Sequence, residues 1–196
     1  KSRIAIVKAG KETNDMENQT TLSTERLILR PFRLADAPEV RRLAGDREIA
    51  AATLRIPHPY EEGMAENWIR SQKDSTGMVF AVTHTAQGDF IGAIGLNVNR
   101  DFDHAELGYW LGTAYWRQGY ATEAARAMLE FGFHTLGLHR IHAHHFLRNP
   151  ASGRVMQKIG MVREGHLRQH VKKWGQYEDI IAYGILKSDY EKGKCA

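Results

Sequence analysis

The chain has 196 residues, which is enough for one domain with a sizeable core and short for two ordinary domains. Hydrophobic residues make up 42% and charged residues 26% of it, values typical of a globular protein, and no apolar run approaches the roughly 18 residues that cross a bilayer. We therefore expect no membrane span. The formal charge of +4 is too small for a concentrated basic face, so we expect no nucleic-acid interface either. The single cysteine, Cys195, allows no internal disulfide, which favours a cytoplasmic location.

Residues 1–15 contribute +2 of the +4. Their charged side chains are Lys1, Arg3, Lys8, Lys11, Glu12 and Asp15. The segment has neither the apolar stretch nor the small-residue cleavage site of a signal peptide. We expect it to be a vector-derived or disordered leader, with Met16 as the natural start and residues 16–196 as a single domain.

Apolar periodicity predicts the elements of the first half of the chain. These are a strand at residues 25–33, helices at residues 34–44 and 61–73, and strands at residues 78–84, 90–99 and 103–112. The turn Gln87-Gly88-Asp89 joins two of these strands into a hairpin.

The second half changes to a strand–helix–strand pattern and ends in a hairpin. The expected elements are a helix at residues 121–136, a strand at 139–147, a helix from Asn149-Pro150, and strands at 162–172 and 177–187. Asparagine suits the cap of that second helix, and proline suits its first position. Its expected buried stripe is Ala151, Val155, Met156 and Ile159.

The stretch from Tyr115 to Thr122 joins the strand at 103–112 to the long helix through a glycine-containing turn. Backbone N–H groups of such a turn lie unpaired at the positive end of the helix dipole and favour an anion. Gly119 permits a tight backbone or a close ligand, and Arg117 adds a permanently charged donor for phosphate oxygens. The loop lacks the Gly-Lys-Ser/Thr ending of a P-loop, which argues against an ATPase or kinase.

Two segments resemble the GNAT superfamily of N-acetyltransferases. The loop Arg117-Gln118-Gly119-Tyr120-Ala121 resembles the signature that cradles the pyrophosphate of acetyl-coenzyme A, and Thr24 to Pro31 (T-E-R-L-I-L-R-P) resembles the first strand of the RimJ/RimL-type branch. The resemblance runs over about residues 24–187. It implies an α+β fold, in which a central, mostly antiparallel seven-stranded sheet is flanked by helices.

The resemblance also assigns residues to acetyl-coenzyme A. The implied coenzyme-binding residues are Leu111, Gly112, Thr113, Arg117, Gln118, Gly119, Tyr120, Ala121, Thr122, Asn149 and Ser152. Asn149 and Ser152 match an N-x-x-S motif, in which the asparagine contacts the pantetheine arm and the serine lies near the sulfur. Ser152 is therefore a candidate proton donor to the departing thiolate, although both residues also suit an ordinary helix start.

Two carboxylates are candidates for the general base. Glu106 lies on the strand at 103–112, and Glu164 lies in M-V-R-E-G, which resembles a segment whose glutamate activates the amine in RimJ/RimL-type enzymes. Either could instead be an ion-pair partner of a nearby Arg163, Arg168 or Lys172 on a solvated strand. The sequence leaves both assignments open, because geometry must decide before pKa does.

The histidines His139, His142, His144 and His145 raise a zinc hypothesis. We predict no metal, since a third ligand at compatible spacing and a cysteine are missing. We expect the chain to move acetyl from acetyl-coenzyme A directly to a primary amine, in particular a protein or peptide α-amine, with the helix at 61–73 beside the acceptor. The alternatives are a small-molecule amine (amino sugar or polyamine) as acceptor, or an acyl-coenzyme A sensor without chemistry. Both monomer and homodimer remain open.

Overall fold

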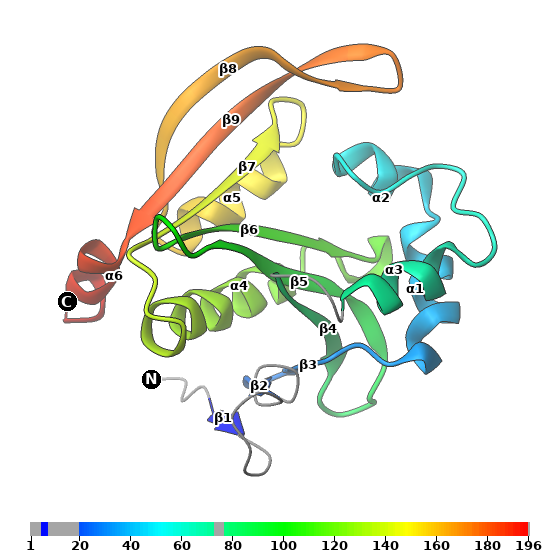
Figure 1. Cartoon of the computed structure of the whole chain (residues 1–196), viewed down its shortest axis with the longest axis horizontal. Coiled ribbons are helices and arrows are strands. Elements are labelled where there is room, and N and C mark those ends of the chain that lie inside the picture. The colour runs from blue at the N-terminus through cyan, green and yellow to red at the C-terminus, as the bar shows by residue number, and fades with distance from the viewer. Residues whose placement is uncertain (1–4, 8–19, 73–76, 196) are drawn as a thin grey trace.

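The computed structural model describes residues 5–7, 20–72 and 77–195 (Figure 1). Its strands form one sheet in the spatial order β1-β2-β3-β4-β5-β6-β7-β9-β8. They are β1 (Ala5–Val7), β2 (Thr21–Ser23), β3 (Leu27–Arg30), β4 (Met78–His84), β5 (Phe90–Asn99), β6 (His104–Leu111), β7 (Arg140–Phe146), β8 (Val162–Lys173) and β9 (Gln176–Leu186). Among these described strands, only β6 and β7 pair in parallel.

The predicted α+β class and the mostly antiparallel sheet are confirmed, but nine strands are described where seven were expected. The additional strands are the short β1 and β2, which extend the edge beside β3. A turn in which the amide of Thr24 donates to the carbonyl of Leu27 (2.9 Å) reverses the chain between β2 and β3. Of the predicted leader, Ala5–Val7 form β1, and its other residues lie outside the described part.

The helical segments fill the connections between the strands, except for α6, which follows β9. They are η2 (Leu34–Asp36), α1 (Ala37–Ala44), α2 (Arg47–Ala52), α3 (Met64–Ser71), η4 (Thr113–Tyr115), α4 (Tyr120–Glu130), the π turn η5 (Phe131–Thr135), α5 (Pro150–Lys158) and α6 (Lys187–Cys195). The helices α2 and α6 were not predicted, because one is only six residues long and the other is highly polar. In the described part of the chain, no helix is both long and apolar enough to span a membrane.

The sheet carries an apolar core on each face. Phe80 and Val82 of β4 pack in the cluster that contains α4, whereas the intervening Ala81 packs in the cluster of α1 and α3. This alternation follows from the two-residue period of a strand. On the α4 side the fully buried Phe131 contributes about 1.5–3 kcal/mol by burial. The sheet is therefore fixed between two layers of helices, which hold its strand ends in place.

The two halves of the sheet separate where β6 meets β7. Only residues 104–106 of β6 pair with residues 140–142 of β7, although the strands continue to Leu111 and Phe146. Beyond this point β6 stays paired with β5, and β7 stays paired with β9. We call this divergence the β6–β7 fork (Figure 1).

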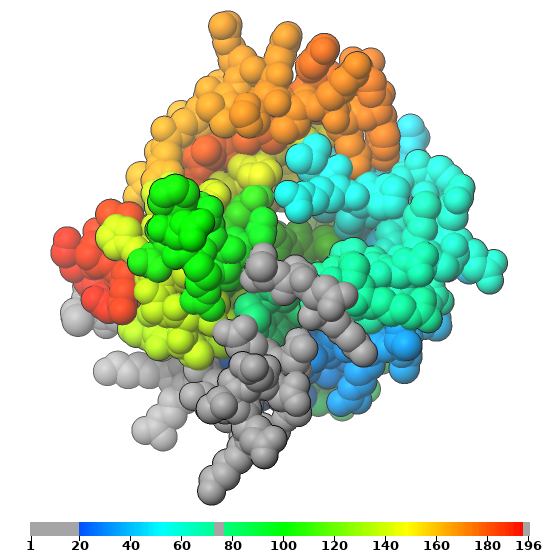
Figure 2. Space-filling view, viewed as in Figure 1, coloured from blue at the N-terminus to red at the C-terminus, as the bar shows by residue number. Residues whose placement is uncertain are grey.

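The hairpin of β8 and β9 curves away from the sheet toward α2 (Figure 1). Near its tip the amine of Lys173 donates to the carbonyls of Leu54 (3.1 Å) and Ile56 (2.7 Å), which follow α2. The surface is hollowed beneath this hairpin, between it and the segment that carries α2 and α3 (Figure 2). We call the hairpin and its contact with residues 54–56 the arch.

Helix α5 differs from its predicted stripe at one position. Met156 and Ile159 are buried and Val155 is partly buried, as expected, but Ala151 is exposed. Gly153 is buried instead, because α5 lies so close to β7 that a Cβ there would meet the ring of His145 at 2.6 Å. The ring of His145 in turn lies 2.8 Å, through Nδ1, from the carbonyl oxygen of Phe146.

Candidate active site

The predicted anion-binding loop has the backbone that such a loop needs. Arg117 (φ 61°) and Gly119 (φ 85°) both adopt left-handed conformations, and Gly119 is the N-cap of α4. A glycine has no side chain that could cap the helix, so the N–H groups of the first turn are left without intrahelical partners. Arg117, Gln118 and Gly119 are all exposed. The loop therefore presents backbone donors and a guanidinium to an anion at the positive end of α4.

Arg26 of the turn before β3 holds this loop in place. Its guanidinium donates to the carbonyl of Gln118 (3.1 Å) and to the carboxylate of Glu123 (2.7 Å), and it lies 4.5 Å from the centre of the Tyr120 ring. Burial alone would raise the pKa of Glu123, but hydrogen bonds from Thr24 and from the backbone and side chain of Arg26 outweigh it and lower the pKa. Sequence reasoning missed this contact, since its partners are 97 residues apart.

Several predicted coenzyme residues direct their side chains elsewhere. Tyr120 is buried, with its hydroxyl 2.7 Å from Nε2 of His84. The hydroxyl of Thr113 donates to Asp46 (3.0 Å), and the carbonyl of Leu111 accepts from the indole of Trp116 (2.7 Å). Gly112 is buried with Leu111, and Ala121 and Thr122 continue into α4. These residues can therefore serve a ligand mainly through their backbone.

The start of α5 lies across the fork from β6. Asn149 caps the helix by accepting from the amide of Ser152 (3.4 Å), as the sequence predicts for a helix cap. The hydroxyl of Ser152 lies 2.7 Å from the hydroxyl of Tyr109 on β6. Burial raises the pKa of Tyr109 to about 12, and the hydrogen bond to Ser152 offsets only part of that rise. Ser152 and the far end of β6 are thus brought together.

The two candidate bases lie in different surroundings. Glu106 is on β6 at the last residue that pairs with β7, and its Oε1 is 3.2 Å from Nδ1 of His144. Glu164 on β8 accepts hydrogen bonds from both terminal nitrogens of Arg140, one of them at 2.6 Å. These hydrogen bonds, more than the charge of Arg140, lower the pKa of Glu164, while partial burial opposes them. A carboxylate whose pKa is lowered in this way is a weak base. Within the described part of the chain Glu106 has no arginine partner of this kind, and it lies at the fork.

The face that carries Glu106 also carries histidines. His142 pairs in register with Glu106, and its ring centre lies 5.2 Å from that of His104. Burial lowers the pKa of His142, against the opposing charge of Glu106. Among the residues that the structure describes, no group of three or more histidine, cysteine, aspartate or glutamate side chains could hold a metal ion.

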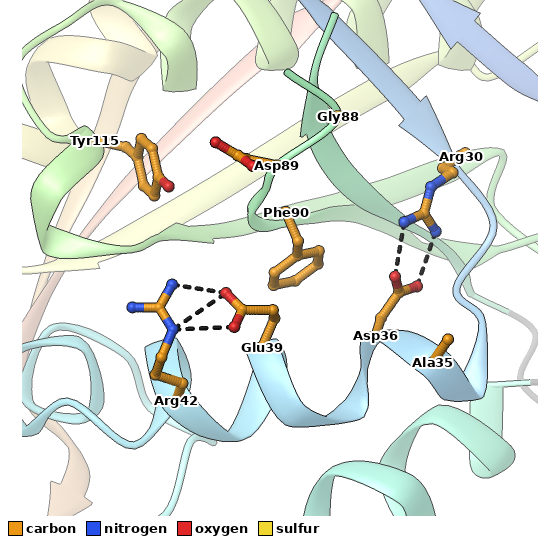
Figure 3. A pocket seen from close by; sticks show the side chains of 9 residues that line it. All are labelled: Arg30, Ala35, Asp36, Glu39, Arg42, Gly88, Asp89, Phe90 and Tyr115. Atoms are coloured by element: carbon orange, nitrogen blue, oxygen red, sulfur yellow. Dashed lines mark hydrogen bonds and ion pairs between the residues drawn. The ribbon is translucent and has the colours of Figure 1, made fainter.

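A polar cavity of about 420 Å³ lies apart from the fork, between α1, the turn before β5 and Tyr115 (Figure 3). Both of its arginines are paired with carboxylates, Arg30 with Asp36 and Arg42 with Glu39. Hydrogen bonds from Arg30 and the Arg33 amide outweigh burial and lower the pKa of Asp36, so this pair stays charged at neutral pH. None of the residues predicted for the site lines this cavity.

Comparison with known proteins defines the class of this protein as an acetyltransferase. Residues 26–162 match the family model described as an acetyltransferase (GNAT) domain. An uncharacterized N-acetyltransferase, p20, of Bacillus licheniformis is 30% identical over 175 residues, which covers 87% of this chain and 98% of that protein. The chain therefore belongs to the GNAT acetyltransferase family, in its RimJ/RimL-like branch.

Solved structures agree in fold and in donor. A GNAT-family acetyltransferase from Bacillus anthracis superposes with a TM-score of 0.79 at 28% identity, over 86% of this chain and 99% of that one. Spermidine N-acetyltransferase from Vibrio cholerae, in complex with CoA and spermine, superposes with a TM-score of 0.73 at 28% identity, over 84% of this chain and 98% of that one.

A further sequence relative is the [ribosomal protein uS5]-alanine N-acetyltransferase of Escherichia coli, which is 27% identical over 62% of this chain and 64% of that protein. The protein is an acetyl-coenzyme A-dependent N-acetyltransferase.

Proposed function

We propose that this enzyme acetylates the α-amine at the N-terminus of a protein or peptide, with Glu106 as the general base and Ser152 beside the departing sulfur. The observation that carries the proposal is the contrast between the two glutamates. Glu106 lies at the fork next to His144, while Glu164 is held by Arg140. The fork itself lies between the coenzyme loop at one end of β6 and the start of α5.

The loop at the start of α4 fits the pyrophosphate of the donor. Its exposed backbone N–H groups and Arg117 suit phosphate oxygens, and the left-handed residues 117 and 119 turn these groups outward. The thioester then reaches Ser152 along the fork, with Asn149 beside the pantetheine arm. Arg26 stabilises this arrangement by donating a hydrogen bond to the carbonyl of Gln118.

The chemistry needs a neutral amine and a place for its proton. An α-amine with a pKa of about 8 is partly neutral at physiological pH, whereas a lysine side chain at about 10.4 is not. The amine nitrogen attacks the thioester carbon and gives its proton to Glu106, directly or through water. The carbon–sulfur bond then breaks with its electron pair on sulfur. No covalent enzyme intermediate is required, since the amine attacks the thioester directly.

The acceptor side favours a polypeptide over a polyamine. Beside Glu106, Gly108 faces open space, since no other described residue would lie within 4 Å of a Cβ there. The exposed charged side chains of β8 are mostly basic, with Arg163, Arg168 and Lys172 against the single carboxylate of Glu164, which Arg140 already holds. Such a strand repels a polycation but tolerates a peptide with carboxylates. The relative from E. coli is named for an alanine of a ribosomal protein, which supports the same choice.

A polyamine is the second candidate, and the observation that favours it is the likeness to the spermidine N-acetyltransferase of V. cholerae. Thiol release from acetyl-coenzyme A separates the two. The panel contains a peptide with a free N-terminus, the same peptide with an acetylated N-terminus and a free lysine, spermidine, and an amino sugar. We expect release only with the free N-terminus. Release with spermidine alone would assign the polyamine, and tight coenzyme binding without any release would make the protein a sensor.

A further inference from the structure

We infer that Tyr109 is a positioning residue for acetyl transfer: its hydroxyl donates a hydrogen bond to Oγ of Ser152 and so directs the serine's own hydrogen toward the departing sulfur. The inference rests on the proposed function, in which Ser152 faces that sulfur. It concerns a residue that the sequence motifs leave without a role. Tyr109 lies on β6, 43 residues away from Ser152 in sequence.

Either hydroxyl could donate in this hydrogen bond, and the distances favour Tyr109 as the donor. Oη of Tyr109 lies 2.7 Å from Oγ of Ser152 and 3.3 Å from the carbonyl oxygen of the same residue. A bond between two hydroxyls has its best length near 2.7–2.8 Å, and 3.3 Å is beyond the usual range. If Ser152 donated to Tyr109, the tyrosine hydrogen would be left with the poor acceptor. If Tyr109 donates to Oγ, its hydrogen has the better acceptor and the serine hydrogen is left for a third partner.

The surroundings keep Tyr109 a donor. Its ring packs against the core on the α4 side, and burial raises its pKa to about 12. The hydroxyl therefore keeps its proton throughout the pH range in which a thiol with a pKa of about 8.5 ionises. Tyr109 therefore gives no proton to the thiolate, but it can fix the direction of the serine hydroxyl that bonds to the sulfur. The fork leaves Ser152 partly exposed, so a third partner has access to it.

The step balances without any further reactant. When the carbon–sulfur bond breaks, its electron pair goes to sulfur, and the serine hydrogen forms a hydrogen bond to the thiolate. The proton of the amine is already on Glu106. The thiolate takes a proton from solvent as it leaves, and Tyr109 and Ser152 end with the protons they began with.

A binding experiment tests the inference without an acceptor. Calorimetry compares coenzyme A with desulfo-coenzyme A, which lacks the sulfur, from about pH 7 to about pH 9.5, where a thiol ionises. In the wild type we expect the affinity for coenzyme A, relative to that for desulfo-coenzyme A, to rise about 10- to 100-fold as the thiol ionises. This is the size of effect expected of a hydrogen bond to a charged group. The variants Tyr109→Phe and Ser152→Ala should each lose this gain, and the double variant should lose no more than either one.

Tyr183→Phe is the matched control. Its hydroxyl accepts from Gln157 of the same helix α5 (3.2 Å). Tyr183 is buried and Tyr109 is partly buried, so this variant removes a tyrosine hydroxyl bonded to the same helix without touching Ser152. We expect this variant to keep the full thiolate preference. In turnover, Tyr109→Phe should lower kcat and leave KM for acetyl-coenzyme A unchanged.

Three outcomes separate the two proposals. A wild-type thiolate preference in Tyr109→Phe, or additive losses in the double variant, would overturn the positioning role. Loss of kcat in Tyr183→Phe to the same extent would reduce Tyr109 to a structural residue. If the thiolate preference follows Tyr109 but no amine in the panel is acetylated, the positioning role stands and the proposed acceptor reaction fails.

Discussion

The coenzyme loop and the arch are built on different principles. The loop between β6 and α4 displays backbone groups, and its shape is set by left-handed residues and by Arg26. The arch displays side chains, and near its tip the buried amine of Lys173 joins it to the segment after α2. Backbone donors suit a phosphate whatever lies nearby, whereas side chains can be exchanged one at a time. We therefore expect the donor to be recognised by geometry and the acceptor to be selected by composition.

The largest effect should come from the base at the fork. Glu106→Gln removes the proton acceptor without changing its size, and we expect kcat to fall about 100-fold or more, as for loss of a general base. Affinity for coenzyme A should not change, because the loop lies at the other end of β6. The matched variant Glu164→Gln should alter kcat by less than about threefold, since Arg140 already holds that carboxylate. Comparable losses in both variants, measured by steady-state kinetics, would show that the base assignment is wrong.

The next effect concerns two glycines, one in each region. Gly119 (φ 85°) opens α4 and Gly175 (φ 81°) lies at the tip of the arch. Alanine in either left-handed position costs about 1–2 kcal/mol, so both variants should lower the free energy of unfolding. Only Gly119→Ala should weaken coenzyme binding, by about tenfold, because it moves the backbone donors. Calorimetric titration of coenzyme A checks this, and equal affinities in the two variants would contradict a backbone-built donor site.

A smaller effect should appear at the contact of the arch. Burial lowers the pKa of Lys173, and the nearby charge of Arg148 adds to this, yet its amine bonds two carbonyls. Lys173→Met keeps the apolar stem but frees the tip, at a cost of about 1–3 kcal/mol. We expect KM for the amine to rise several-fold and KM for acetyl-coenzyme A to stay constant. The exposed neighbour Lys172→Met is the control, and a rise in KM for acetyl-coenzyme A would show that the arch also shapes the donor site.

The smallest effect should be visible only in acid. The pKa of Glu123 is lowered from its ordinary value of 4.5, so its contact with Arg26 stabilises the fold above that pH and is lost as the pH falls through the lower, folded value. Because Arg26 is 41% exposed, we expect less than about 1 kcal/mol. Urea unfolding at pH 7 and below pH 4 should show a shallower acid loss in Glu123→Gln than in the exposed control Glu62→Gln. If the free energy of unfolding falls equally in both variants on acidification, the contact between Glu123 and Arg26 adds no stability.

Local patterns predicted most of the sheet and the main helices. The hairpin of β4 and β5, the helix α4 and the cap at Asn149 follow from alternation, periodicity and turn residues that lie within a few positions of one another. The helix α2 was not predicted because its six residues, R-E-I-A-A-A, are too few to show the apolar period of a helix. Such elements depend on packing more than on their own pattern.

The contacts that shape the site are long-range and could not be predicted. Lys173 is 119 residues from Leu54, and Arg26 is 97 residues from Glu123. Sequence reasoning left Glu106 and Glu164 equal, because both are glutamates on strands. What distinguishes their surroundings is Arg140 on β7. It reaches Glu164 on β8 across β9, which lies between these two strands in the sheet.

The fork has a consequence for what can enter it. Where β6 and β7 part, each strand keeps its ladder on one side and presents the other side inward, toward its former neighbour. Most sheets expose such a side at the rim, where a strand of another protein can add and aggregate. Here it lies within the sheet, between β6 and β7. On the proposed function, the amide groups of the donor would pair with this side, and its place inside the sheet would keep it away from the strands of other proteins.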